Sequence, residues 1–129
     1  MMMRYVLIVC ILLSSMLFAE LQKKNYSSGE LKSETNYNAG KKDGLAKGYH
    51  KNGKTKYTVS YKKGKKSGLA KSYYKSGTLR AEENYKDGSL NGLCKQYYKS
   101  GKLKSDFTFQ DDLPVSGTKY TENGKKVEG

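Results

Sequence analysis

Few side chains in this sequence have the types and spacing that catalysis requires. His50 is the only histidine among 129 residues, so a Ser-His-Asp set has no second candidate for its base. Three carboxylates, Glu34, Glu82 and Asp106, occupy equivalent positions of a repeat. On a sheet they would lie about 10 Å apart, too far to share a proton as paired catalytic carboxylates do. The sequence therefore predicts a protein that is not an enzyme, with no catalytic residue, no metal site and no cofactor.

The positively charged side chains are the one feature that could be functional. The chain carries 25 Lys and Arg against 12 Asp and Glu, a net charge of +13. Cations that recur beside tyrosine rings suit a protein partner or an anionic component of the cell envelope. Nucleic acid fits the charge as well, but the export predicted below disfavours it, and contact with membrane is expected only through the signal segment or surface charge. A simpler interpretation stays open, in which the lysines provide solubility and protect sheet edges.

The candidate binding surface consists of three sets of residues, and the members of each set share a column of the repeat. The sets are Lys47, Lys71 and Lys95; Tyr49, Tyr73 and Tyr97; and Lys32, Arg80 and Lys104.

A repeat of 24 residues places these side chains. Glycines recur at 29, 53, 77 and 101, and aromatic residues at 37, 61, 85 and 109, which is typical of a repeat array. Polar and apolar side chains alternate over 31–37, 55–61, 79–85 and 103–109, as in half-buried strands. A second set of strands is predicted over 45–49, 69–74 and 93–98.

Two kinds of turn separate these strands. Asn-Gly or Ser-Gly at 52–53, 76–77 and 100–101 predicts tight hairpin turns, because glycine adopts positive φ without strain. The segments with two glycines, such as 86–92, predict slightly longer loops. The fold class is therefore all-β: an open antiparallel β-meander of about four 24-residue hairpin repeats, preceded by an N-terminal signal helix. The apolar content after residue 19 is too small for a thick core, so a thin sheet is expected.

The two ends of the chain differ from the array. Residues 1–19 combine Arg4, a short apolar run and Ala19, which predicts a signal peptide cleaved near Ala19 and a periplasmic or secreted protein. Residues 20–25 are expected to be a polar lead-in, and 26–129 the array. From about residue 110 the repeat becomes atypical, and Pro114 predicts a cap that blocks pairing at the sheet edge.

The pattern Gly-x-Leu-Lys-x-Glu-x-x-Tyr-x-x-Gly-Lys-x-Asp-Gly-x-x-Lys-x-Tyr-Tyr resembles the bacterial variant of the MORN repeat. Gly29–Lys47 and Gly77–Tyr98 carry it most fully, and Gly53–Tyr74 and Gly101–Phe109 less so. The resemblance implies an open antiparallel sheet that acts as a binding or scaffolding module. Many bacterial members are labelled antitoxins of toxin–antitoxin pairs.

One departure from that family concerns the position after the Gly-Leu step. A tryptophan is frequent there, and this chain has Ala46, Ala70 and Cys94 instead. A binding role of that tryptophan therefore does not carry over. The function expected from the sequence is that of an exported, non-catalytic MORN-like module for a protein or an anionic envelope component. The alternative is an antitoxin-like protein that neutralises a cognate toxin by direct contact.

Overall fold

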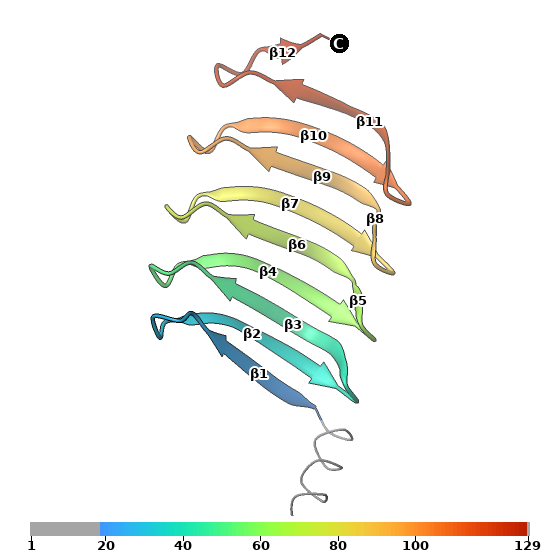
Figure 1. The fold of residues 1–129 in the computed structure, drawn as a ribbon. Helices are drawn as coiled ribbons and strands as arrows, with labels where there is room; N and C mark the ends of the chain where they lie inside the picture. Colours follow the sequence, from blue (N-terminus) through green and yellow to red (C-terminus); the bar gives the residue numbers. More distant parts are fainter. Residues whose placement is uncertain (1–18, 129) are drawn as a thin grey trace, which may run out of the picture.

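A single layer of antiparallel strands forms the whole of the described fold (Figure 1). The computed structural model describes residues 19–128, so the predicted signal helix lies outside the described residues. In the described part of the chain, no helix has the length and apolar character of a membrane span. The prediction of an open all-β meander is confirmed for this part.

The twelve strands of residues 19–128 belong to one antiparallel sheet, in which the long strands follow one another in sequence order. Their order is β1-β2-β3-β4-β6-β7-β9-β10-β11-β12, with β5 paired to β4 and β8 paired to β7. The strands are β1 (Glu20–Asn25), β2 (Leu31–Asn38), β3 (Lys41–Tyr49), β4 (Thr55–Lys62), β5 (Lys65–Lys66), β6 (Gly68–Tyr73), β7 (Leu79–Lys86), β8 (Ser89–Leu90), β9 (Gly92–Tyr97), β10 (Leu103–Gln110), β11 (Leu113–Tyr120) and β12 (Lys126–Val127).

The segment expected to be a polar lead-in is itself a strand. β1 pairs with β2 from Glu20↔Tyr37 to Asn25↔Leu31 and forms the first edge of the sheet. All six of its side chains are exposed, so no hydrophobic pattern marked it in the sequence. Backbone pairing to β2, rather than side-chain burial, defines this strand.

The turns have the opposite lengths from those predicted. The two-residue turns lie at the double-glycine segments, where Ala39, Lys63 and Asp87 each have φ of 49° and precede a glycine of positive φ. Positive φ at both central residues is the type I′ turn of tight hairpins. The Asn-Gly and Ser-Gly segments form longer connections; for example, the amide of Gly53 donates to the carbonyl of His50, 2.9 Å away.

A β-bulge interrupts every full repeat at the same position. The extra residue on the bulged strand, which has no partner in the ladder, is always a cation. These residues are Lys32, Lys56, Arg80 and Lys104. A bulge bends its strand and re-aims a side chain, so the strict alternation predicted for 31–37 and its equivalents fails at these positions.

The buried residues are small and lie on one face of the sheet. Ala46, Val59, Ala81 and Cys94 are buried, together with Ser105, and among residues 19–128 no large side chain is completely enclosed. Ala46, Val59 and Ala81 line one cavity together with the larger side chains of Tyr61 and Tyr85. The prediction of a thin structure without a two-layer core is confirmed.

The last hairpin closes the array with an incomplete ladder. β11 pairs along β10, but on its other side only Lys119 and Tyr120 pair with β12. Pro114 lies in the part of β11 that has no outer partner, and a proline has no N–H to donate to another strand.

Candidate binding surface

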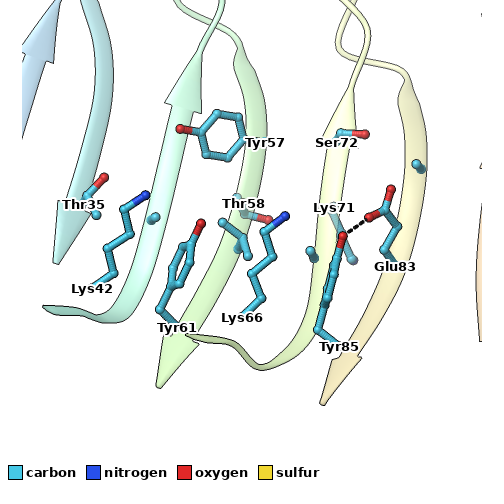
Figure 2. A pocket seen from close by; sticks show the side chains of 14 residues that line it. Thr35, Lys42, Tyr57, Thr58, Tyr61, Lys66, Lys71, Ser72, Glu83 and Tyr85 are labelled. Atoms are coloured by element: carbon cyan, nitrogen blue, oxygen red, sulfur yellow. Dashed lines mark hydrogen bonds between the residues drawn. The ribbon is translucent and has the colours of Figure 1, made fainter. Parts of the chain in front are cut away.

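The two faces of the sheet carry different side chains, because successive residues of a strand point to opposite sides. We call the face with Tyr57, Tyr61 and Tyr85 the tyrosine face; Figure 2 shows that Tyr61 and Tyr85 point the same way. The opposite face, with Leu45 and Leu69, is called the leucine face. Both faces are open, since the described chain forms one layer.

A continuous row of nine side chains crosses the leucine face, and each member is the register partner of the next. In order from β1 to β11 the row contains Lys23, Glu34, Lys47, Thr58, Lys71, Glu82, Lys95, Asp106 and Thr118. Lysines and carboxylates therefore alternate, except at Thr58 and at Thr118, where the row ends. Lys47, Lys71 and Lys95 do not form a purely positive row, because Glu82 stands between Lys71 and Lys95, and Thr58 stands between Lys47 and Lys71.

Tyrosine hydroxyls hold the carboxylates of this row. Tyr49 donates to Glu34 at 2.9 Å, and Tyr97 donates to Glu82 at 3.3 Å. The hydrogen bond from Tyr49, together with Lys23 at 3.4 Å, lowers the pKa of the Glu34 carboxyl below its ordinary value. The same hydrogen bond raises the pKa of Tyr49, whereas burial and then the charge of Glu82 raise that of Tyr97.

Tyr120 extends this pattern to the last hairpin, where its hydroxyl lies 3.5 Å from the Asp106 carboxylate. Tyr73 is the exception, because its hydroxyl makes no hydrogen bond within residues 19–128. The residue at the corresponding acidic position is Thr58.

An exposed leucine of each repeat lies beside the charged row. Leu21, Leu45, Leu69 and Leu93 are between 41% and 49% exposed, and they recur on every second strand of the path. Between them, the amides of Asn36 and Asn84 donate to the carbonyls of Leu45 and Leu93 at 2.7 and 2.6 Å. These leucines give the leucine face a regular line of apolar side chains.

The third predicted set, Lys32, Arg80 and Lys104, consists of the bulge residues. Arg80 and Lys104 line a shallow pocket with Ala81 and Glu83 of the tyrosine face. The ammonium of Lys104 lies 5.6 Å from the centre of the Tyr98 ring, and that of Lys32 lies 5.6 Å from Tyr26. These distances allow cation–π attraction. The structure therefore divides the predicted surface between the two faces.

His50 replaces a tyrosine that joins one repeat to the next. The hydroxyls of Tyr26, Tyr74 and Tyr98 donate to carbonyls of Tyr49, Tyr97 and Tyr120 at 2.7 Å. In the second repeat, His50 Nε2 lies 2.9 Å from the carbonyl of Tyr73. A carbonyl only accepts, so Nε2 carries the proton in this contact. The ring nitrogen thus performs the structural task of a hydroxyl.

The tyrosine face contains a cavity of about 290 Å³ between two cation–aromatic pairs (Figure 2). Lys42 lies 5.0 Å from the centre of the Tyr61 ring, and Lys66 lies 4.7 Å from that of Tyr85. Tyr85 also donates to Glu83 at 2.5 Å. Burial, followed by this carboxylate, raises the pKa of Tyr85, so the phenol is neutral at physiological pH.

The remaining candidates for chemistry are few. Cys94 is a buried free thiol, and burial raises its pKa, which favours the unreactive protonated form. Among residues 19–128, no three His, Cys, Asp or Glu side chains are grouped as a metal site would need.

Sequence reasoning placed the lysine and tyrosine columns but missed their partners. Lys47 and Tyr49 do lie together on the leucine face, as do their equivalents. The predicted binding surface does not contain the exposed leucines or the acidic residues of the charged row, although both columns are visible in the repeat. Thr58, the one non-acidic member of the carboxylate column, was also visible as an exception.

Comparison with known proteins identifies the repeat. A family model described as MORN repeat variant matches residues 21–39, 42–63, 66–87 and 90–111. No curated protein and no solved structure shows significant similarity to the chain.

Proposed function

The chain belongs to the MORN repeat variant family, and from this premise we propose that it is an exported, non-catalytic module that binds or scaffolds a protein or an anionic envelope component. The observation that carries the proposal is the pair of open faces, on which each repeat presents the same kinds of groups at the spacing of two strands. That spacing is about 10 Å, so a partner meets a regular array rather than one enclosed site.

The charge of the array supports a partner that is acidic. The net charge is +13, and the cations include the bulge residues and the lysines that lie over tyrosine rings. Association with an acidic partner would be fast at low salt and would weaken as salt screens the charges.

The absence of catalysis is part of the same proposal. The ring nitrogen of His50 is engaged with a backbone carbonyl, and the carboxylates of the leucine face are engaged with tyrosines. These groups are occupied in supporting the sheet and are not aimed into a shared cavity.

A retention experiment tests the binding function. Immobilised protein is exposed to an envelope extract at about 50 mM salt and then washed at about 500 mM. The proposal expects an envelope component to be retained at low salt and released at high salt. Retention of nothing at low salt refutes it.

Fractionation with mass spectrometry of the N-terminus tests export. The proposal expects protein outside the cytoplasm with a processed N-terminus near Ala19. A purely cytoplasmic pool would instead support the antitoxin-like alternative, which further requires a toxic partner.

A further inference from the structure

One repeat lacks the carboxylate that the equivalent position of the other repeats contains. Glu34, Glu82 and Asp106 recur in the charged row of the leucine face, and Thr58 occupies the same position of the second repeat. Thr58 has a shorter and uncharged side chain, so the lysines beside it face no acidic residue at that point in the row.

The groups that hold a carboxylate are nevertheless retained around Thr58. Lys47 and Lys71 are its register partners on the two neighbouring strands. Directly opposed residues have Cβ atoms about 5 Å apart, which brings both ammonium groups within reach of an anion above Thr58. The hydroxyl of Tyr73, whose counterparts donate to Glu34 and Glu82, makes no hydrogen bond within the described residues.

The first repeat shows which group these hydrogen-bond donors bind. In the first repeat the Glu34 carboxylate accepts from Tyr49 and faces Lys23 and Lys47. Thr58 has residues of the same types at the equivalent positions: Lys47 and Lys71 are its register partners, each of which also pairs with an acidic residue on its other side, and Tyr73 takes the place of Tyr49 in the repeat. A carboxylate supplied by another molecule would satisfy these donors in the manner that Glu34 does.

Apolar side chains lie next to this position on the same strands. Leu45 is two residues before Lys47, and Leu69 is two residues before Lys71; both are more than 40% exposed. Ser60 lies between these leucines, in the position that Asn36 and Asn84 occupy in other repeats. The serine is smaller than asparagine and leaves the facing sides of the two leucines less covered.

We propose that an acidic side chain of a protein partner docks above Thr58, between Lys47 and Lys71, and that an apolar side chain two residues away in the same extended segment packs between Leu45 and Leu69. Two residues of an extended chain span about 6.7 Å, which is also the distance along β4 from Thr58 to Ser60. The proposal rests on the binding function above and names the chemistry of the partner.

A peptide fits this surface better than an acidic polysaccharide does. Both could supply a carboxylate, but the exposed leucines favour contact with an apolar side chain, which a uronic acid polymer lacks. The proposal therefore commits to a protein segment.

Amide NMR on isotopically labelled protein expressed from the full sequence tests the site. The probes are the blocked peptides Ser-Asp-Ser-Leu-Ser and Ser-Asn-Ser-Leu-Ser, with trigalacturonate as the polysaccharide arm. We expect the Asp peptide to shift amides centred on Thr58, Lys71 and Tyr73, and the Asn peptide to bind at least tenfold more weakly. Equal binding of the two peptides, or tighter binding of trigalacturonate, overturns the proposal.

Matched variants separate the site from general electrostatics. Thr58→Glu places the chain's own carboxylate in the gap and is expected to weaken the Asp peptide at least tenfold. Thr108→Glu adds the same charge to the same face beside Leu93 and is expected to weaken it less than threefold. Equal effects of the two variants overturn the proposal, as does an unchanged affinity in Thr58→Glu.

A measurement on Thr58→Glu without any ligand provides a second test. If the donors form a carboxylate site, the introduced carboxyl has a pKa below the ordinary glutamate value, as Glu34 does, and the circular dichroism spectrum is unchanged. An ordinary or raised pKa in a folded variant overturns the proposal. The two proposals can fail separately. Failure of the envelope retention experiment refutes the proposed binding function, and the peptide titration tests the docking site above Thr58.

Discussion

The ring of Tyr57 lies directly over Gly48, its register partner on β3. A Cβ atom added to Gly48 would lie 2.1 Å from Cε1 of that ring, far inside van der Waals contact. Because Gly48 has no side chain, it leaves the space that the Tyr57 ring occupies. Phe107 and Gly117 form the same combination between β10 and β11.

Replacement of Gly48 by alanine should destabilise the sheet. The methyl group forces the Tyr57 ring out of its position, and we expect the free energy of unfolding to fall by about 1–3 kcal/mol. Urea denaturation measures the change. Ser72→Ala, at the equivalent position of the next repeat, is the control and should stay within about 0.5 kcal/mol. A Gly48→Ala variant as stable as this control would contradict the packing described.

The histidine that joins two repeats should be replaceable by tyrosine and not by phenylalanine. His50→Phe removes the donor to the Tyr73 carbonyl and should lower stability by about 1 kcal/mol. His50→Tyr restores the hydroxyl that Tyr26, Tyr74 and Tyr98 use and should recover it. Thermal unfolding of the three proteins, compared at one pH, is the measurement. A His50→Phe variant as stable as the unaltered protein would show that the ring nitrogen contributes nothing, and equal loss in both variants would show that a tyrosine hydroxyl does not replace it.

Acid should weaken the contact between Glu34 and Tyr49. The pKa of Glu34 is lower in the folded state than in the unfolded state. Its ionised carboxylate therefore stabilises the folded state above the ordinary pKa of about 4.3, and this stabilisation is lost as pH falls through the folded-state pKa. Tyr49→Phe removes the main cause, and NMR titration should show the pKa of Glu34 rising towards its ordinary value. An unchanged pKa would assign the shift to Lys23 instead.

The Cys94 thiol should resist alkylation while the sheet is intact. Burial raises its pKa and limits access, so iodoacetamide at pH 8 should modify Cys94 at least tenfold more slowly in native buffer than in 8 M urea. Peptide mass spectrometry measures the modification at this residue alone. Cys94→Ala should fold normally, because Ala46 and Ala70 occupy the same column.

The repeat made most of the fold predictable from sequence. Strict alternation over 55–61 and its equivalents located β4, β7 and β10 within a residue or two. The small number of aliphatic residues after residue 19 indicated a single layer, and the column glycines located the turns. The predicted turn lengths were wrong, because Ala39 and Lys63, which precede Gly40 and Gly64, adopt positive φ. Alanine and lysine rarely adopt this conformation, so the sequence did not indicate it.

The candidate site was less predictable because it depends on register across strands. The bulge at Arg80 and its equivalents shifts the ladder by one residue, and no residue type in the sequence marks a bulge. Without the register, Glu82 could not be placed opposite Lys71 and Lys95, nor Thr58 opposite Lys47 and Lys71. β1 was missed for a related reason, since its pairing with β2 leaves no trace in its exposed side chains.

The bulge that recurs in every repeat has a geometrical consequence for any long partner. A bulge increases the local right-handed twist, and the bulges fall at equal intervals, so we expect each repeat to add a similar amount of twist to the sheet. A stiff, straight filament laid across the strands would diverge from the leucines after a few of them. We expect a partner that follows them from Leu21 to Leu93 to be flexible or twisted in the same sense.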